Sequence, residues 1–248
     1  MLTAERRAHL LSVLARDGKV LAKVVAAELG LSEDTIRRDL RDLADEGLLQ
    51  RVYGGALPAA PAAQPYLART TLATASKERV ARTAVALIEP GATVVLDGGT
   101  TALAVARALP ASLRATILTP SPSTAVALAE ATGVEIVMLG GVVHRHSLVV
   151  GGALAAEQIA RVRADVFLLG VTGVSARTGL TTGEVEDAAT KRALAARSAQ
   201  TWVLASAEKI GAASAHEVLS LAQVAGVVSD GEDHPELRAL REAGVTVL

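Results

Sequence analysis

The sequence contains no cysteine and only four aromatic residues in 248 positions. The absence of cysteine excludes disulfides and thiolate metal sites, and it is typical of proteins in a reducing compartment. No stretch of about 18 uncharged apolar residues is present, so no membrane span is expected. Glu5, Arg6 and Arg7 interrupt the N-terminal segment, which does not match a signal peptide. These absences predict a cytoplasmic protein.

The charge of the chain is almost balanced. The formal net charge is −1, and residues 1–57 carry nine basic and nine acidic residues. This excludes a protein that coats nucleic acid through bulk positive charge, so any DNA contact must come from a local grouping of charge. Half of the residues are apolar, which is enough for one large or two modest domains with a core of Ala, Val and Leu.

Patterns at the N-terminus predict a winged helix-turn-helix. Residues 3–16 form an amphipathic helix, and residues 20–30 supply the first helix of the turn motif. A second helix follows Ser32, whose side chain is a good N-cap. Residues 48–53 alternate like a strand and end at two glycines, which is the pattern of a wing.

The second helix of the motif has an apolar back and an arginine-bearing front. Ile36, Leu40 and Leu43 are spaced i, i+4 and i+7 and form one stripe that we expect to be buried. Arginine offers a planar fork of donors that matches phosphate oxygens or the edge of guanine. The predicted DNA-binding residues are Ser32, Thr35, Arg37, Arg38, Arg41, Arg51 and Tyr53.

These residues are expected to have different roles. Thr35, Arg37 and Arg38 lie near the start of the helix, where a recognition helix reaches base edges. Arg41 lies further along and is expected to bind phosphate, and Arg51 in the wing to touch the DNA backbone or the minor groove. The alternative is a solvated helix whose arginines pair with acidic residues three or four positions away.

The segment after the wing predicts a domain boundary. Residues 58–75 contain three prolines and no acidic residue, so they cannot form one continuous helix. We expect a partly extended linker there, between a DNA-binding domain at residues 1–57 and a second domain at residues 76–248.

The second domain alternates helical and strand patterns. Strands are predicted at residues 92–97, 114–120, 134–141, 164–174, 201–206, 225–230 and 245–248. Alternation of this kind implies an α/β domain, with a largely parallel sheet covered by helices on both faces. Ligands of such sheets bind at the carboxyl ends of the strands.

A glycine-rich loop at one strand end predicts a phosphate site. Residues 97–101, Asp-Gly-Gly-Thr-Thr, follow a strand and open a helix. The glycines let the backbone approach an anion, the threonines add donors, and the helix N-terminus is positive. Asp97 would repel phosphate, so it is expected to face sugar hydroxyls. The loop matches neither a Walker motif nor a dinucleotide fingerprint, and an ordinary strand-to-helix turn is the alternative.

One lysine outside this loop could contribute to the same site. Lys191 could supply a point charge to a phosphate, and the alternative is a surface lysine paired with Asp187 four positions earlier. His144 and His146 stand two positions apart without a carboxylate or cysteine nearby, so no metal and no other cofactor is expected.

Longer runs carry a family resemblance. The run DTIRRDLRDLADEGLLQRVYGGA resembles the winged helix of DeoR-type bacterial transcription regulators. Residues 76–231 resemble the sensor domain of that family through the segments LDGGTT, LTPS, LGGVVHRHSLVVG, DVFLLGVTGV, EDAATKRA and ASAEKIG. Four positions depart from the family pattern, with Tyr53 in place of His, Pro120 in place of Asn, Asp187 where Glu is more frequent, and Ser206 in place of Asp.

The resemblance implies a sensor fold similar to ribose-5-phosphate isomerase and CoA-transferase-like proteins. It also implies that a phosphorylated sugar or related metabolite binds over these loops. Together with the strand-end loops, it gives the predicted effector-binding residues, Asp97, Gly98, Gly99, Thr100, Thr101, Ser121, Gly141, Arg145 and Lys191.

The sequence therefore predicts a DNA-binding repressor of a carbohydrate catabolic operon, released from its operator by a phosphorylated sugar. A neutral DNA module binds weakly alone, so a homodimer or homotetramer on double-stranded operator DNA is expected. The alternative is a sugar-phosphate isomerase with an accessory N-terminal domain, in which Asp97 or Glu186 would be the general base. No catalytic residue is assigned in the preferred interpretation.

Overall fold

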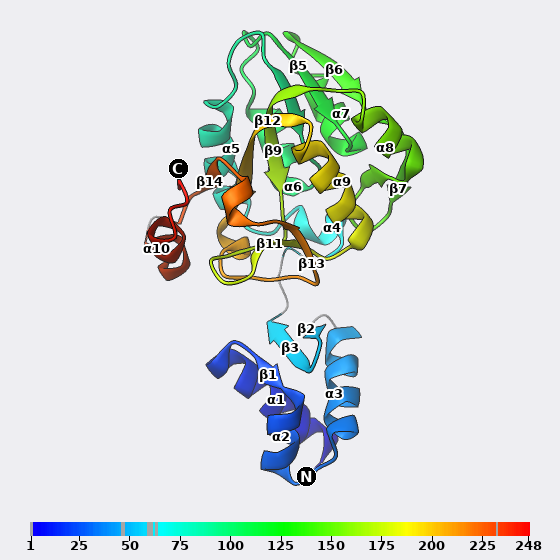
Figure 1. Ribbon diagram of the computed structural model, residues 1–248, viewed down its shortest axis with the longest axis vertical. Helices are drawn as coiled ribbons and strands as arrows, with labels where there is room; N and C mark the ends of the chain where they lie inside the picture. Colours follow the sequence, from blue (N-terminus) through cyan, green and yellow to red (C-terminus); the bar gives the residue numbers. More distant parts are fainter. Residues whose placement is uncertain (1, 46–47, 59–61, 63, 232) are drawn as a thin grey trace.

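The computed structural model describes residues 2–45, 48–58, 62, 64–231 and 233–248. A small N-terminal part, which contains α1 to α3, is followed by a larger α/β part (Figure 1). The elements of the N-terminal part are α1 (Thr3–Asp17), β1 (Val20–Leu21), α2 (Ala22–Leu29), α3 (Glu33–Asp45), β2 (Leu49–Val52) and β3 (Gly55–Pro58). This is the predicted winged helix-turn-helix, with α2 and α3 as the motif and β2–β3 as the wing.

The predicted apolar stripe holds α3 in place. Ile36, Leu40 and Leu43 are at most 1% exposed and lie in one core with side chains of α1 and α2. Burial of each contributes about 1.5–3 kcal/mol. Asp39 is also buried, and Arg6 of α1 binds both of its carboxylate oxygens. Apolar packing and an ion pair therefore fix the orientation of α3, and with it the direction of its exposed arginines.

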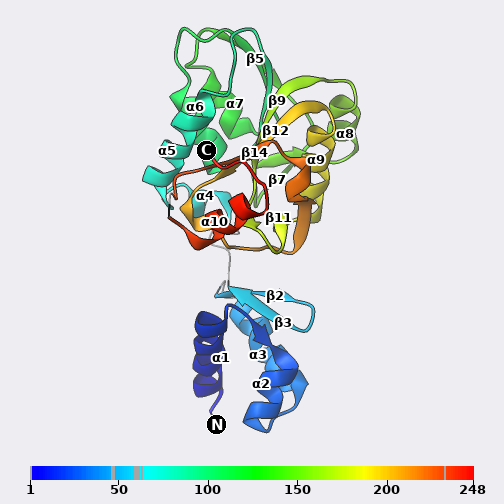
Figure 2. The same cartoon turned by 60° about the vertical axis from the view of Figure 1, so that its left-hand side comes forward.

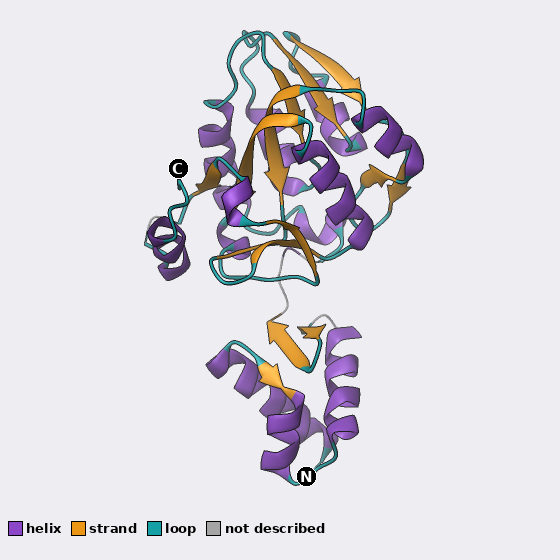
Figure 3. Ribbon diagram, in the orientation of Figure 1, coloured by secondary structure: helices purple, strands orange, loops and turns teal. Residues whose placement is uncertain are grey.

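The wing pairs with a short strand that was predicted to be helical. β2 and β3 are antiparallel, and β3 also pairs with Val20 and Leu21, so α2 begins only at Ala22 (Figure 3). The hairpin depends on Gly55, because a Cβ there would lie 1.8 Å from the carbonyl oxygen of Val20. Pairing with the wing overrides the helical pattern at these two residues.

A six-stranded sheet forms the centre of the α/β part, in the order β14-β12-β9-β4-β5-β6, and every neighbouring pair is parallel. This confirms the predicted parallel α/β sheet. The strands are β4 (Thr93–Leu96), β5 (Ala115–Thr119), β6 (Val134–Met138), β9 (Ala164–Gly170), β12 (Ser198–Ala205) and β14 (Gly226–Ser229).

Helices cover both faces of this sheet, as predicted (Figure 2). One apolar core lies between the sheet and α5 (Thr74–Val85), α6 (Thr100–Ala108) and α7 (Pro122–Leu128). The other lies between the sheet and α8 (Ala153–Ile159), α9 (Val185–Ala195) and α10 (Pro235–Glu242). With so few aromatics, these cores consist mainly of Ala, Val, Leu and Ile, with fully buried Phe167 in the second.

Several short elements were not predicted. The hairpin β7 (Val142–His144) and β8 (Val149–Gly151) lies beside α8, and β10 (Gly173–Ser175), β11 (Gly179–Thr182) and β13 (His216–Leu219) form a separate antiparallel sheet. The predicted strand at 164–174 is divided into β9 and β10. The predicted strand at 245–248 is reduced to one bridge between Val227 and Val247. Such short strands carry too few residues for a clear period-two pattern.

The second half of the expected linker packs on the α/β part. Residues 59–61 and 63 lie outside the described residues. Beyond them, α4 (Tyr66–Arg69) packs on the α/β part, where Tyr66 is 4% and Arg69 9% exposed. Residues 64–73, which we call the docking segment, therefore belong structurally to the larger part rather than to a free linker.

Candidate DNA-binding face and effector site

Five of the predicted DNA-binding residues line one groove between α3 and the wing, and these are Arg37, Arg38, Arg41, Arg51 and Tyr53. All five side chains are exposed, and Tyr53 stands fully exposed at the tip of the wing. A helix and a wing that present four arginines into one groove form a local positive face on a module that is neutral overall.

The other two residues, Ser32 and Thr35, shape the start of α3. The Oγ of Ser32 accepts a hydrogen bond from the backbone N–H of Thr35 at 3.2 Å, which is an N-cap. The two hydroxyl oxygens are 2.9 Å apart. The pair therefore satisfies the first turn of the helix and presents two hydroxyl groups at its exposed end.

The alternative of arginines paired with nearby acids holds for one of the three helix arginines. Arg37 donates to Glu33 at 2.8 Å and lies 3.9 Å from Asp34. Arg38 and Arg41 have no ion pair among the described residues. Their guanidinium groups are the more available donors for a DNA ligand, and Arg37 would first have to leave Glu33.

The predicted phosphate loop lies at the point where the strand order of the sheet reverses. From β4 the chain proceeds to β5 and β6 on one side, whereas from β9 it proceeds to β12 and β14 on the other. Such a switch point leaves a crevice at the carboxyl ends of the two central strands. Asp97 after β4 accepts a hydrogen bond from the N–H of Gly170 at the end of β9, at 2.8 Å, and so closes the bottom of this crevice.

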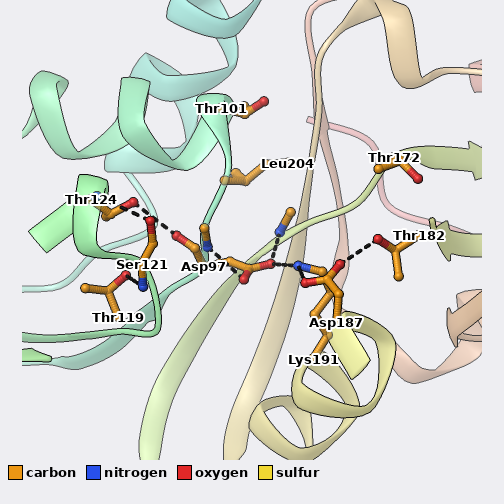
Figure 4. A network of polar contacts seen from close by, with 12 residues as sticks. Asp97, Thr101, Thr119, Ser121, Thr124, Thr172, Thr182, Asp187, Lys191 and Leu204 are labelled. Atoms are coloured by element: carbon orange, nitrogen blue, oxygen red, sulfur yellow. Dashed lines mark hydrogen bonds and ion pairs between the residues drawn. The ribbon is translucent and has the colours of Figure 1, made fainter. Parts of the chain in front are cut away.

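Lys191 lies in the lining of this crevice, as predicted, but two carboxylates of the protein already engage it. Its Nζ lies 2.7 Å from Asp97 and 2.9 Å from Asp187, with all three side chains at most 7% exposed (Figure 4). Thr182 donates to the other oxygen of Asp187 at 2.5 Å. Burial would lower the pKa of Lys191, but the two carboxylates outweigh it and raise that pKa. The pairing with Asp187 was foreseen, but the lysine is buried, and its charge is neutralised within the protein.

Asp97 was expected to face sugar hydroxyls, but in the structure it lies beneath the pocket lining rather than in it. The residue is fully buried, and it accepts hydrogen bonds from the N–H groups of Gly98 and Gly170 and from Lys191. Burial raises the pKa of Asp97, and the charge and hydrogen bond of Lys191 oppose that rise. Asp97 therefore joins β4, β9 and α9 beneath the pocket.

The rest of the predicted loop lines a pocket, together with residues from β9, β11 and α9. Gly99 has φ of 92°, a conformation that favours glycine, and a Cβ on Gly98 would lie 2.2 Å from a methyl group of Val149. Thr100 and Thr101 open α6, whose first N–H groups have no partner within the helix. The loop thus presents a helix N-terminus to the pocket.

Lys209, which was not predicted, is the second lysine in the pocket lining. Its Nζ donates to Thr101 Oγ1 at 2.8 Å and to the carbonyl of Leu204 at 3.0 Å, without a carboxylate partner in ion-pair range among the described residues. Burial lowers the pKa of Lys209 to about 7, with Glu208 opposing and nearby cations reinforcing the shift. Its position just after strand β12 was the sequence signal that could have identified it.

Three predicted effector residues do not line this pocket. Ser121 is fully buried and caps α7 by accepting from the N–H of Thr124. Gly141 packs against β8, where a Cβ would lie 2.7 Å from the carbonyl of Gly151. Arg145 is exposed in the turn of the β7–β8 hairpin. All three were selected because they follow a strand in the sequence. That position alone does not distinguish a residue that packs or caps a helix from one that contacts a ligand.

Two of the positions that depart from the family pattern have clear structural partners. The carbonyl of Pro120 accepts from Val150 N–H at 2.8 Å, which ties the end of β5 to β8. Asp187 holds both Lys191 and Thr182, as described above.

Neither of the two bases named for the isomerase alternative is available to a ligand in the pocket. Asp97 is buried and engaged by three donors, and Glu186 is exposed and absent from the pocket lining. In the described part of the chain, no three His, Cys, Asp or Glu side chains group to hold a metal. Within the same residues, no helix is long and apolar enough to cross a membrane.

A winged helix with an arginine-lined groove, followed by an α/β part with a pocket at its switch point, defines a DNA-binding regulator with a sensor. Two family models match the chain, the DeoR-like helix-turn-helix domain over residues 6–60 and the DeoR C terminal sensor domain over residues 72–231. The chain belongs to the DeoR family, and it is a DNA-binding transcription regulator of that type rather than an enzyme.

Relatives align over nearly the whole length. A putative aga operon transcriptional repressor from Escherichia coli O157:H7 is 33% identical, covering 99% of this chain and 93% of that protein. The glycerol-3-phosphate regulon repressor from Escherichia coli strain K12 is 29% identical, covering 93% and 92%. A solved ribose 5-phosphate isomerase A from Methanocaldococcus jannaschii matches 51% of this chain and 50% of its own, at 18% identity and a TM-score of 0.38.

Proposed function

We propose that this regulator represses a carbohydrate catabolic operon and leaves its operator when a phosphorylated sugar or related metabolite binds the pocket at the switch point. The names of the relatives support the class of operon, because they include an aga operon repressor and a glycerol-3-phosphate regulon repressor. The main structural support is the excess of buried positive charge around the pocket.

That excess can be seen side chain by side chain. Four cations around the pocket are at most 9% exposed, and these are Arg69, Lys77, Lys191 and Lys209. The carboxylates with comparably buried side chains are Asp97, Asp187 and Glu208, while Glu184 at the rim is partly exposed. A buried cation without a counter-charge is costly, and an anion at the N-terminus of α6 would compensate it.

The groove of α3 and the wing is proposed to bind the operator, with Arg38 and Arg41 as its principal donors. A module of zero net charge has little non-specific affinity, so two copies on paired half-sites are needed for tight binding. We therefore propose a homodimer or homotetramer assembled through residues 76–248, acting in the cytoplasm on double-stranded DNA. Residues 1–57 are the proposed DNA-binding domain, and the docking segment extends the sensor domain towards it.

Phosphorylated and unphosphorylated forms of the same compound test the effector class. Glycerol 3-phosphate and sugar phosphates are expected to raise the melting temperature of the full-length protein, whereas glycerol and the free sugars are not. Ligand at about 100 times its Kd adds roughly 2.7 kcal/mol of stability. Equal effects of a phosphate ester and its free alcohol, measured by differential scanning fluorimetry, would rule out a phosphate anchor.

Binding of the phosphate ester should also take up a proton. At pH 8 Lys209, with its pKa near 7, is mostly neutral in the free protein, and a bound dianion would raise that pKa and recharge it. The phosphate ester is itself already a dianion at this pH, since its second pKa is about 6. We expect nearly one proton taken up per ligand at pH 8, less at pH 6, and an affinity that falls as the pH rises above 7.

Calorimetry in two buffers of different ionisation enthalpy measures this uptake directly. Lys209→Met keeps the length of the side chain and is expected to abolish the uptake and to weaken binding about ten-fold or more. Unchanged proton uptake in Lys209→Met would assign the proton to another group.

A further inference from the structure

We infer that Arg69 is an effector-binding residue that the docking segment contributes to the sensor pocket, so that one anion holds the segment and the pocket together. The inference rests on the proposed function, because it uses the same pocket. It adds Arg69, which lies outside the strand-end loops, to the proposed ligand contacts. It also gives a way for the ligand to restrain the docking segment, which leads to the DNA-binding part.

The docking segment is held against the sensor by its main chain. The N–H of Tyr66 donates to the carbonyl of His146 at 2.8 Å, next to residues of the β7–β8 turn that line the pocket. On the other side, Lys77 of α5 donates to the carbonyl of Arg69 at 2.8 Å and to that of Leu72. Residues of the segment thus lie between α5 and the β7–β8 hairpin, at the mouth of the pocket.

The guanidinium of Arg69 lies in the pocket lining, but only some of its N–H donors have a hydrogen-bond acceptor there. Its Nε donates to the carbonyl of Gln64 at 2.8 Å, and the group lies 5.8 Å from the centre of the Tyr66 ring. A methyl group placed on Gly99 would lie 3.5 Å from its Nη1. Among the described residues, no carboxylate lies within ion-pair distance and no acceptor engages the two terminal nitrogens.

This environment indicates an anion rather than an ordinary structural arginine. Arg69 is 9% exposed, and burial lowers its pKa, against the weaker effect of Asp187, Glu208 and Glu184. A guanidinium presents two parallel donors that match a phosphate in a bidentate pair. The N–H groups of α6 that have no partner within the helix begin at Gly99, which lies beside the guanidinium of Arg69. The fork and the helix N-terminus can therefore bind the same phosphate group.

The position of Arg69 in the chain gives the contact a regulatory consequence. β3 of the wing ends at Pro58 and α4 begins at Tyr66, so only a short stretch of chain joins the wing to the docking segment. An anion that binds Arg69 stabilises the docked form of the segment. If the DNA-bound state requires the segment to be displaced, linkage makes that state bind the effector less tightly.

Hydrogen exchange with inorganic phosphate as the probe tests both parts of the inference in the full-length chain. Phosphate should slow amide exchange across residues 64–72 in the native protein. Arg69→Met, which keeps the alkyl stem, should bind phosphate about ten-fold more weakly or worse and should lose the slowing at saturation. Arg82→Met on the exposed face of α5 is the matched control and should behave like the native protein.

Arg69→Lys keeps the charge without the fork, so it remains informative if Arg69→Met folds poorly. It should bind phosphate with a smaller loss but still fail to slow exchange in the segment. Native affinity in Arg69→Met, or slowing at residues 64–72 that persists in both variants, would overturn the inference and leave the proposed phosphate site standing. No phosphate binding by the native protein at millimolar concentration would instead overturn the proposed function, and this inference with it.

Discussion

Lys191→Ala is expected to destabilise the sensor part by about 3–5 kcal/mol, far more than the loss of a surface ion pair would cost. The lysine is the cation between Asp97 and Asp187, and removing it leaves two buried carboxylates without a counter-charge. Lowering the pH should reduce this loss of stability, because protonated carboxyl groups are neutral and do not require a counter-charge.

Urea unfolding followed by the fluorescence of Trp202 measures this effect, because Trp202 lies in β12 and is the single tryptophan. Arg161→Ala is the control, since Arg161 pairs with Glu157 on the exposed side of α8 at 2.9 Å. That surface pair contributes about 0–1 kcal/mol. Similar losses for the two variants would mean that the charge of Lys191 is not needed inside the fold.

Arg38→Ala is expected to reduce operator affinity by about 1–3 kcal/mol, which corresponds to roughly 5–150-fold. Arg38 is exposed in the groove and has no ion pair among the described residues, so its donors are free to read a base edge. Arg37→Ala should cost less, because Arg37 must first give up its contact with Glu33.

Fluorescence anisotropy with DNA from the regulator's own promoter region, and with a scrambled version, distinguishes base reading from phosphate binding. If Arg38 reads a base, Arg38→Ala lowers affinity for the operator and leaves the scrambled DNA almost unchanged. An equal fall on both DNAs would make Arg38 a phosphate contact. Arg82→Ala, in the sensor part, should change neither affinity.

The sequence predicted those elements whose patterns are long and local. The stripe of Ile36, Leu40 and Leu43 repeats at helical spacing, and runs such as Ala-Thr-Val-Val-Leu at 92–96 are rich in β-branched residues, so both were predicted with the correct type. Strands β11 and β13 are as long as β4, with four residues each, but they lack its run of β-branched and apolar residues, and β7 and β8 have only three residues each. Their pairing depends on neighbours distant in sequence, which periodicity does not detect.

The site was less predictable because its contacts are non-local. The spacing of Lys191 and Asp187 indicated their pair, but Asp97 is 94 positions away and its approach depends on the topology of the sheet. Arg69 carried no signal at all, since its burial results from docking of a proline-rich segment that looked like a linker. The glycine loop was found because its chemistry is contained in five consecutive residues.

The proposed phosphate anchor at the switch point consists largely of main-chain N–H groups at the start of α6, held from beneath by the Asp97–Lys191 pair. Main-chain donors survive most side-chain substitutions, so evolution can keep this half of the site while altering the other. The rim is different, because His146 and Glu184 come from loops and turns and are at least partly exposed, so their side chains can change at less cost to the fold. Paralogues could therefore diverge in the sugar they detect through a few rim substitutions while retaining one mode of phosphate capture.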